Sequence, residues 1–184
     1  MYQPAEDSWL LSETTEKFLK NELKNKQINK QIKILDIGSG TGIQAETIMK
    51  LGFKNILTSD IDEKAVKLLK KKFKSVKSDL FSDIKEKFDL IVFNPPYLPE
   101  DKKEPEDSKT ATTAGKKGYE LIVSFLKQAK IHLNKNGKIL ILFSSLSKPE
   151  IIKEKTKKLN YKFKLINKQK LFFEELFVYC FTQK

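Results

Sequence analysis

The sequence of 184 residues contains no arginine, although its formal net charge is +12. All 36 basic residues are therefore lysines. A basic surface suits a polyanionic partner, because contacts between basic side chains and phosphates dominate non-specific affinity for nucleic acids. Arginine, however, is the better side chain for bidentate recognition of phosphate and guanine. The charge is thus compatible with nucleic-acid binding but does not favour it over other functions.

Cysteine and histidine are also scarce, with one residue of each, Cys180 and His132. A single cysteine cannot build a disulfide framework or a cysteine-based zinc site within the chain. Cys180 lies in an apolar run, which predicts a buried strand residue in a reducing compartment. His132 lies near a predicted helix end, where we expect it to cap the helix or pack against it. We therefore expect no metal site.

Long apolar segments are missing as well. No part of the sequence reaches the roughly 18 consecutive apolar residues of a membrane-spanning helix. A secretory leader begins with basic residues and continues with an apolar stretch, whereas the beginning of this sequence includes Glu6 and Asp7. We therefore expect a cytoplasmic protein that has no membrane partner.

The spacing of apolar residues predicts alternating strands and helices. An amphipathic helix over residues 4–23 comes first. Strands are then expected over residues 33–37, 55–59, 75–78 and 88–93, with helices over 41–51 and 63–73 between the first three. This alternation is typical of an open, doubly wound α/β sheet. The length and the 39% hydrophobic content predict one domain over residues 1–184, in which residues 1–30 form an N-terminal helical segment.

The second half of the chain continues the pattern after a polar interval. Residues 99–117 contain two prolines and no apolar periodicity, which predicts a long loop that faces the substrate. Further along, we expect a helix over 118–133, a strand over 137–143 after an Asn-Gly turn, and a helix over 149–159. Two apolar segments, 161–166 and 176–181, are spaced to form a pair of strands.

A glycine-rich turn between the first strand and the next helix indicates a ligand site. Residues 36–42 read Asp-Ile-Gly-Ser-Gly-Thr-Gly, and glycines allow a tight turn and a close approach to a ligand. The spacing of Gly38, Gly40 and Gly42 differs from the dinucleotide fingerprint G-x-G-x-x-G. Asp36 would repel a pyrophosphate but attract a cationic ligand. These features favour S-adenosylmethionine over NAD.

Acidic residues follow the next two predicted strands. Asp60, with Ile61 after it, ends the second strand, where a carboxylate can accept hydrogen bonds from both hydroxyls of a ribose. Asp79 follows the third strand and can accept a hydrogen bond from the amino group of adenine, while Leu80 offers an apolar wall for the ring. Together with the glycine turn, these residues predict a site for an adenosyl group.

The tetrapeptide Asn94-Pro95-Pro96-Tyr97 follows the fourth predicted strand at the same edge of the sheet. An amide or arylamine nitrogen is a poor nucleophile, because its lone pair is delocalised. The Asn94 side-chain oxygen and the Pro95 carbonyl can each accept one N–H bond and orient such a nitrogen. The prolines stiffen this pair of acceptors, and Tyr97 can stack on the planar group. The tetrapeptide therefore predicts methyl transfer to a planar nitrogen, with a glutamine amide and an adenine amine equally acceptable.

Together, these motifs resemble those of the HemK-type protein-glutamine N(5)-methyltransferases. More narrowly, the sequence is similar to the short archaeal and eukaryotic branch that methylates the Gly-Gly-Gln glutamine of class I release factors. The resemblance rests on residues 2–8 (Tyr-Gln-Pro-Ala-Glu-Asp-Ser), 35–42, 59–62 and 94–97, and includes a degenerate glycine-containing segment at 115–122. Asn-Pro-Pro-Tyr also occurs in DNA adenine and some RNA methylases, so N(6)-methylation of adenine is the alternative.

The resemblance implies a fold, a cofactor and partners. The implied fold is the class I, Rossmann-like methyltransferase fold, a seven-stranded, mostly parallel sheet with an antiparallel last strand and helices on both faces. S-adenosyl-L-methionine is the expected cofactor and S-adenosyl-L-homocysteine its product. A class I release factor is the expected substrate. Relatives work with a small zinc-binding activator subunit that adds a strand to the sheet, so we expect a heterodimer through the edge near residues 75–78.

The motifs and the resemblance together give a set of expected site residues. Lys116 and Lys117 depart from the family pattern, because relatives often carry an acidic residue there. The arginines that relatives use elsewhere are absent too, so the departures concern recognition of the target. The expected catalytic residues are Asn94, Pro95 and Tyr97, and the expected cofactor contacts are Ser8, Asp36, Gly38, Gly40, Asp60, Ile61, Asp79, Leu80 and Asn94.

Overall fold

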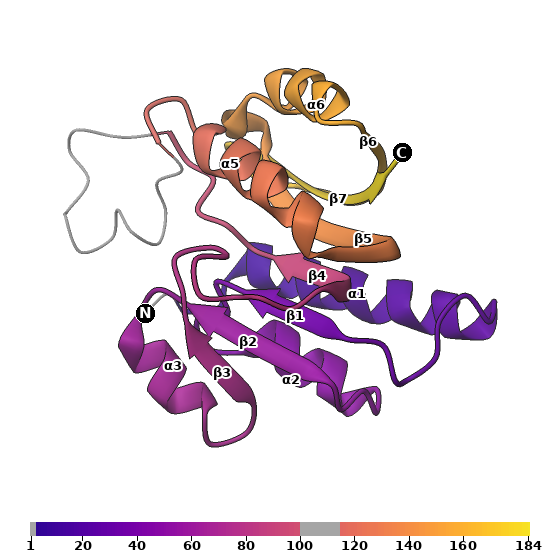
Figure 1. The fold of residues 1–184 in the computed structure, drawn as a ribbon. Helices are drawn as coiled ribbons and strands as arrows, with labels where there is room; N and C mark the ends of the chain where they lie inside the picture. Colours follow the sequence, from indigo (N-terminus) through magenta and orange to yellow (C-terminus); the bar gives the residue numbers. More distant parts are fainter. Residues whose placement is uncertain (1–2, 100–114) are drawn as a thin grey trace.

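The computed structural model describes residues 3–99 and 115–184, which form a seven-stranded sheet with helices on both faces (Figure 1). The strands lie in the order β3-β2-β1-β4-β5-β7-β6. All neighbours pair in parallel except β7, which is antiparallel to both β5 and β6. This confirms the expected fold class. The strands are β1 Ile34–Ile37, β2 Ile56–Asp60, β3 Lys74–Lys77, β4 Phe88–Phe93, β5 Leu133–Ser144, β6 Tyr161–Lys170 and β7 Glu175–Gln183.

The helices divide between the two faces of the sheet. The α-helices are α1 Glu6–Lys24, α2 Ile43–Lys50, α3 Glu63–Leu69, α5 Glu120–Ala129 and α6 Pro149–Lys158, and the short 3₁₀ helices are η1 Lys130–His132 and η2 Ser145–Ser147. Residues of α1 and α2 share one hydrophobic cluster with the sheet, and residues of α5 and α6 share the other. Figure 1 shows α5 in front of the sheet and α1 behind it. None of the described helices is long and apolar enough to cross a bilayer.

The central strand β4 shows why this sequence forms a sheet covered on both sides. Ile91 and Phe93 belong to the cluster under α5, whereas Leu90 and Val92 belong to the cluster under α1 and α2. Successive side chains of a strand point to opposite faces, so a near-continuous apolar run fills both clusters at once. Both edge strands are more polar. At one edge, β3 covers residues 74–77, one position earlier than predicted.

The region before β5 differs from the prediction. The helix expected over residues 118–133 ends at Ala129, and β5 already begins at Leu133. The Asn-Gly pair, which we expected to form a turn before the strand, lies inside β5 at an irregularity where the pairing with β4 shifts. Asn136 there has a φ of 65°, and a Cβ on Gly137 would lie 2.9 Å from the Phe88 carbonyl oxygen. The prediction of a turn was wrong because positive φ and glycine also suit a β-bulge.

Two single residues occupy the environments predicted for them. His132 is buried, its ring stacks on Phe81 with 4.5 Å between centroids, and its Nδ1 lies 3.0 Å from the Glu86 carbonyl oxygen. Cys180 is buried in β7, and burial raises the pKa of its thiol to about 11. Both side chains thus serve packing. The loop predicted over residues 99–117 lies largely outside the described residues.

Candidate active site

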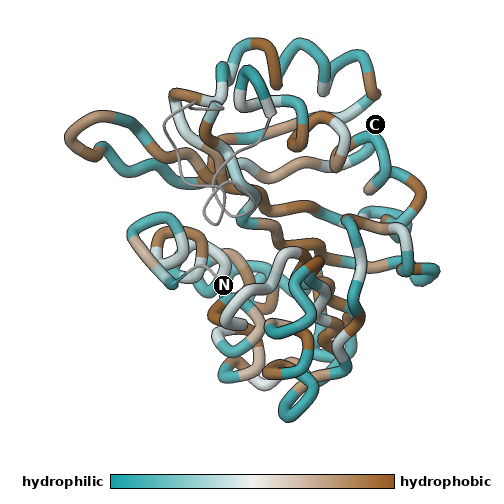
Figure 2. The backbone as a smooth tube through the Cα atoms, turned by 90° about the vertical axis from the view of Figure 1, so that its left-hand side faces the viewer, coloured by the Kyte–Doolittle hydropathy of each residue, from teal (hydrophilic) through white to brown (hydrophobic). Residues whose placement is uncertain are grey.

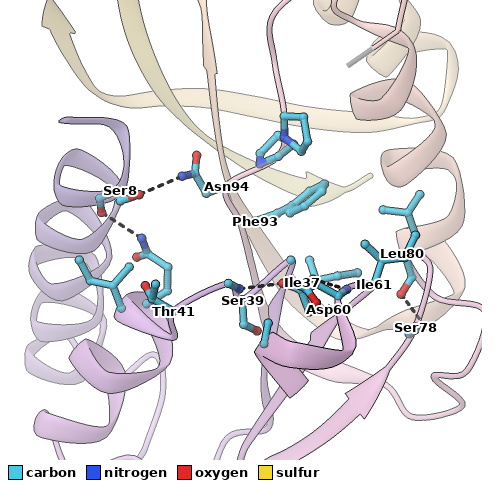
Figure 3. Close-up of a pocket in the computed structure, with 18 of the residues that line it drawn as sticks. Ser8, Ile37, Ser39, Thr41, Asp60, Ile61, Ser78, Leu80, Phe93 and Asn94 are labelled. Carbon is cyan, nitrogen blue, oxygen red and sulfur yellow. Dashed lines mark hydrogen bonds between the residues drawn. The ribbon is translucent and has the colours of Figure 1, made fainter. Parts of the chain in front are cut away.

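A cavity of about 480 Å³ lies where β1, β2, β3 and β4 end (Figure 3). Its volume falls in the range of roughly 300–1,000 Å³ that is typical of small-molecule sites. Because parallel strands end at one edge of the sheet, motifs from four strands meet here. Nearly all the predicted site residues line the cavity: Ser8, Gly38, Gly40, Asp60, Ile61, Asp79, Leu80, Asn94 and Pro95. Asp36 and Tyr97 do not.

The glycine turn after β1 forms one wall of the cavity. Gly38 and Gly40 have φ values of +64° and +52°, in the left-handed region that favours glycine. A Cβ on Gly38 would lie 3.0 Å from the Phe93 ring, whereas a Cβ on Gly40 would project into open space. The turn therefore brings bare backbone to the cavity.

The Asp60 carboxylate is held in place by backbone amides. Its Oδ2 accepts a hydrogen bond from the Gly40 N–H at 2.7 Å, and its Oδ1 accepts one from the Asp62 N–H at 2.8 Å. Each carboxylate oxygen has a further lone pair, so the group can still accept hydrogen bonds from a ligand. Asp60 thus presents an oriented pair of acceptors at the end of β2.

Asp36 lies behind the glycine turn and not in the cavity. It is buried, and its Oδ2 accepts a hydrogen bond from the Ala45 N–H at 3.1 Å, in the first turn of α2. Burial raises the pKa of Asp36 to about 7, with a smaller contribution from the charge of Asp60, against the opposing effect of the Ala45 hydrogen bond. The side chain is turned toward the start of the helix, where a carboxylate satisfies a free N–H group. Asp36 does not line the cavity, and its direct contact with a cationic ligand stays a prediction.

Asn94 presents an unpartnered acceptor. Its Nδ2 donates to Asp7 Oδ2 at 3.1 Å and lies 3.4 Å from Ser8 Oγ. The Asp7 carboxylate is itself oriented by the Ser8 N–H, 2.6 Å from Oδ1. A carboxylate only accepts hydrogen bonds, so it engages the amino group of Asn94 and directs the carbonyl the other way. Asn94 Oδ1 is buried and has no hydrogen-bond partner in the described part of the chain.

Gln44 of α2 repeats this arrangement. Its Nε2 donates to the Ser8 carbonyl at 2.9 Å, and its Oε1 is buried without a partner among the described residues. The first turn of α1 is thus held by Asn94 from the loop after β4 and by Gln44 from α2. Figure 3 shows Ser8 of α1 beside Asn94.

Tyr97 anchors the tetrapeptide to the protein interior. Its side chain is half-buried and packs against both hydrophobic clusters, and its carbonyl accepts a hydrogen bond from Ser147 Oγ at 2.8 Å. A Cβ on Gly118 would lie 3.0 Å from the Tyr97 carbonyl oxygen, so the chain packs closely here. Tyr97 does not line the cavity and its side chain packs against the clusters, so its stacking on a substrate group stays a prediction.

Sequence reasoning missed several lining residues. Asp7 adjoins the predicted Ser8 in the N-terminal motif, so the motif could have indicated that Asp7 lines the cavity. Nothing in the sequence indicated Gln44, since glutamine is common in the first turn of a helix. The remaining lining residues are Pro4, Ile37, Ser39, Thr41, Ile43, Asp62, Ala65, Ser78, Phe93, Pro96 and Leu121. Among the described residues, no group of three or more His, Cys, Asp or Glu side chains could hold a metal ion.

Comparison with known proteins matches this chain to methyltransferases. Residues 11–170 match the family described as "Methyltransferase small domain". A Methanocaldococcus jannaschii protein, named as a candidate protein N5-glutamine methyltransferase, is 39% identical over 97% of this chain and 89% of its own length. The release factor glutamine methyltransferase of Borreliella burgdorferi is 36% identical over 59% of this chain and 43% of its own. The E. cuniculi Mtq2-Trm112 complex, described as methylating the termination factor eRF1, superposes with a TM-score of 0.76 at 22% identity, covering 100% and 98% of the two chains.

Proposed function

The chain belongs to the methyltransferase small domain family, and we propose that it methylates the side-chain amide nitrogen of a glutamine in a peptide chain release factor. Its cofactor is S-adenosyl-L-methionine. The proposed target is the glutamine of the Gly-Gly-Gln motif of a class I release factor. The names of the M. jannaschii and B. burgdorferi relatives support a glutamine amide as the acceptor.

The observation that carries this proposal is the unpartnered Oδ1 of Asn94. A buried acceptor without a hydrogen bond costs about 1–3 kcal/mol, a cost that a bound N–H donor removes. The Pro95 residue beside it also lines the cavity, so its carbonyl can accept the second N–H of a primary amide. Two acceptors that hold both N–H groups would fix the plane of the target amide. They would thereby set the direction of its nitrogen lone pair in the cavity.

The lining of the cavity fits the cofactor. Asp60 offers two oriented oxygens for the ribose hydroxyls, and Asp79 can accept from the adenine amino group. Leu80 and Ile61 supply apolar walls for the adenine ring, and the glycine turn allows close approach of the methionine portion. Gln44 Oε1 is a further free acceptor, suited to the ammonium group. When bound, the cofactor supplies an electrophilic methyl group on a cationic sulfur.

We also propose that the chain is a single catalytic domain in which residues 1–30 pack over the cofactor site. The protein would work in the cytoplasm together with a small zinc-binding activator subunit. Asp7 and Ser8 at the start of α1 line the cavity, which supports the role of the N-terminal segment. The short strand β3 lies at an edge of the sheet, where a strand of a second protein can pair with it. The E. cuniculi protein of similar fold is described as a complex, which supports a partner subunit.

A methyl-transfer assay with radiolabelled cofactor tests the proposed function. Purified release factor, the same factor with asparagine in place of the target glutamine, DNA and tRNA are offered separately. We expect label on the intact release factor only. Label on nucleic acid alone would favour adenine N(6)-methylation instead. Cofactor binding without transfer to any substrate would indicate a binding protein.

A further inference from the structure

The turn between β6 and β7 carries two highly exposed phenylalanines. Phe172 and Phe173 expose 92% and 86% of their surface, more than any other large apolar residue of the described chain. Their rings contact each other edge to face, with 4.6 Å between centroids and 77° between planes. In Figure 2, the hairpin of β6 and β7 projects from the body and has a hydrophobic end. Exposed apolar patches of this kind mark interaction sites.

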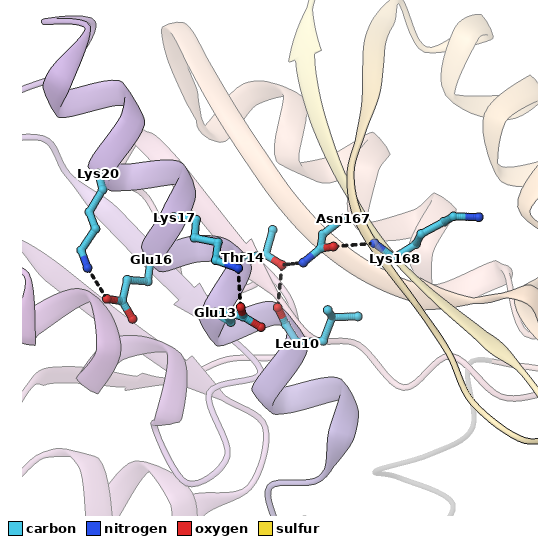
Figure 4. Close-up of polar contacts among 8 residues, drawn as sticks. All are labelled: Leu10, Glu13, Thr14, Glu16, Lys17, Lys20, Asn167 and Lys168. Atoms are coloured by element: carbon cyan, nitrogen blue, oxygen red, sulfur yellow. Dashed lines mark hydrogen bonds and ion pairs between the residues drawn. The ribbon is translucent and has the colours of Figure 1, made fainter.

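The projecting turn is joined to the rest of the fold by hydrogen bonds and packing. The Leu171 N–H donates to the Glu174 carbonyl at 2.8 Å and closes the turn, while the Leu171 side chain packs against a core cluster. Along β6, Asn167 Nδ2 donates to Thr14 Oγ1 of α1 at 3.0 Å (Figure 4). The phenylalanines are therefore held outward by an ordered hairpin, although apolar side chains gain stability from burial.

The turn also lies close to the catalytic tetrapeptide. Leu176 pairs with Ser144, the last residue of β5, so the turn extends from the same edge of the sheet as the cavity. The Glu175 N–H donates to Ser145 Oγ at 3.1 Å, and Ser147 Oγ donates to the Tyr97 carbonyl at 2.8 Å. The three-residue helix η2 thus holds both the hairpin and the tetrapeptide. Two strand spacings, roughly 10 Å, separate β4 from β7 in the sheet.

The chemistry around the two rings favours a protein partner over a nucleic acid. Glu174 and Glu175 directly follow the phenylalanines, and the nearby Lys168 already pairs with Glu175 at 2.9 Å. This local charge gives a phosphate backbone no net attraction. The nearly perpendicular rings also do not form one flat platform for successive bases. An apolar surface of a protein, in contrast, can bury both rings.

We propose that Phe172 and Phe173 form a docking surface for the protein substrate, and that they bury themselves in an apolar surface beside the target glutamine. The inference rests on the proposed function, because it takes the methyl acceptor to be a side chain of a folded protein. The docking surface would hold the protein substrate while the amide of its glutamine enters the cavity. It predicts that the rings affect recognition of the whole substrate and not the chemistry of transfer.

The test compares Phe172→Ser/Phe173→Ser with Ile131→Ser. Ile131 is 70% exposed on η1, just before the start of β5, so it is a matched apolar residue at the opposite edge of the sheet. For each protein, calorimetry measures the Kd for purified release factor, and initial rates measure kcat/KM for the intact factor and for a short peptide containing its glutamine. We expect the double variant to bind the factor at least tenfold more weakly and to lose at least tenfold in kcat/KM on it. The kcat/KM of the double variant on the peptide should stay within twofold of wild type. For Ile131→Ser, the Kd for the factor and both values of kcat/KM should stay within twofold of wild type.

Each other outcome decides a separate question. If the double variant binds release factor as tightly as wild type, the proposal of a docking surface is wrong. The proposed function is tested separately, by whether the wild-type protein transfers the methyl group to release factor. If wild type methylates neither factor nor peptide, the proposed function fails, and the calorimetry alone then decides the docking surface. Loss of nucleic-acid methylation in the double variant would assign the rings to a nucleic acid. Loss of self-association, measured by sedimentation, would assign them to a second copy of the chain. Both of these results would overturn the proposal.

Discussion

The side-chain amino group of Asn94 donates a hydrogen bond to the carboxylate of Asp7, with 3.1 Å between Nδ2 and Oδ2 and 87 positions between the residues in the chain. This contact uses the amino group of Asn94 as the donor and leaves the buried Oδ1 without a partner among the described residues. The oxygen is left as an acceptor, which is what a target N–H requires. The first turn of α1 therefore contributes to the orientation of Asn94, in the proposed catalytic tetrapeptide, as well as to the wall of the cavity.

Replacing Asn94 by alanine should abolish methyl transfer while cofactor binding is largely retained. Loss of an oriented hydrogen-bonding group from an active site typically lowers kcat by about 10²–10³-fold. The Kd for S-adenosyl-L-homocysteine, measured by calorimetry, should change by less than about fivefold, a small free energy on this scale. An equal loss of transfer and of cofactor affinity would contradict the role assigned to Asn94.

Replacing Asp7 by asparagine should lower kcat about tenfold, or roughly 1.4 kcal/mol. An asparagine can both donate and accept, so it would no longer favour one orientation of the Asn94 amide. Single-turnover transfer rates at saturating cofactor measure the effect. The matched control is Glu13→Gln, which removes an exposed carboxylate paired with Lys17 on the same helix. If both variants transfer at the wild-type rate, Asp7 does not position Asn94.

Replacing Gly40 by alanine should weaken cofactor binding in addition to lowering the stability of the fold. Its φ of +52° costs an alanine about 1–2 kcal/mol, and the added methyl group would project into the open space at the cavity wall. Gly52→Ala is the control, because its φ is +89° and its Cβ would meet only the end of the Lys30 side chain, 3.0 Å from Nζ. Thermal unfolding should show similar losses for both variants, whereas calorimetry should show weaker cofactor binding only for Gly40→Ala.

The contribution of Asp36 to the stability of the protein should fall as the pH rises to about 7, and Asp36→Asn should remove this pH dependence. Burial raises the pKa of Asp36 to about 7 in the folded protein, whereas an aspartate in an unfolded chain has a pKa of about 3.9. The folded state therefore binds this proton more tightly, so the contribution is full below pH about 4 and is lost above about 7. Denaturant unfolding between pH 4 and 8 should show the variant gaining stability relative to wild type, on the order of 2–4 kcal/mol. A constant difference across this range would contradict the raised pKa.

The positions of the site motifs followed from local patterns in the sequence. Apolar runs predicted the strands, and polar or glycine residues at their ends predicted Gly38, Asp60, Asp79 and Asn94 as neighbours. All four line the cavity. The reason is physical, because parallel strands necessarily end at one edge of their sheet, and the order of the elements therefore specifies which residues gather there.

The directions of individual side chains were a matter of tertiary structure. Asp36 turns toward the N-terminus of α2 and Tyr97 toward the core, although both belong to motifs that border the cavity. The Asn136-Gly137 pair could form a turn or a bulge, and only its pairing with β4 decides between them.

By itself, the sequence determined the order of the strands and helices and the chemical groups at the edge of the sheet, because both depend on short-range periodicity and on where each strand ends. Only the tertiary structure decided that Asp7 and Gln44 hold the first turn of α1, and that Phe172 and Phe173 remain outside the core. These features depend on contacts between residues far apart in the chain, and no local pattern encodes which partner a buried amide meets or which apolar side chains stay exposed.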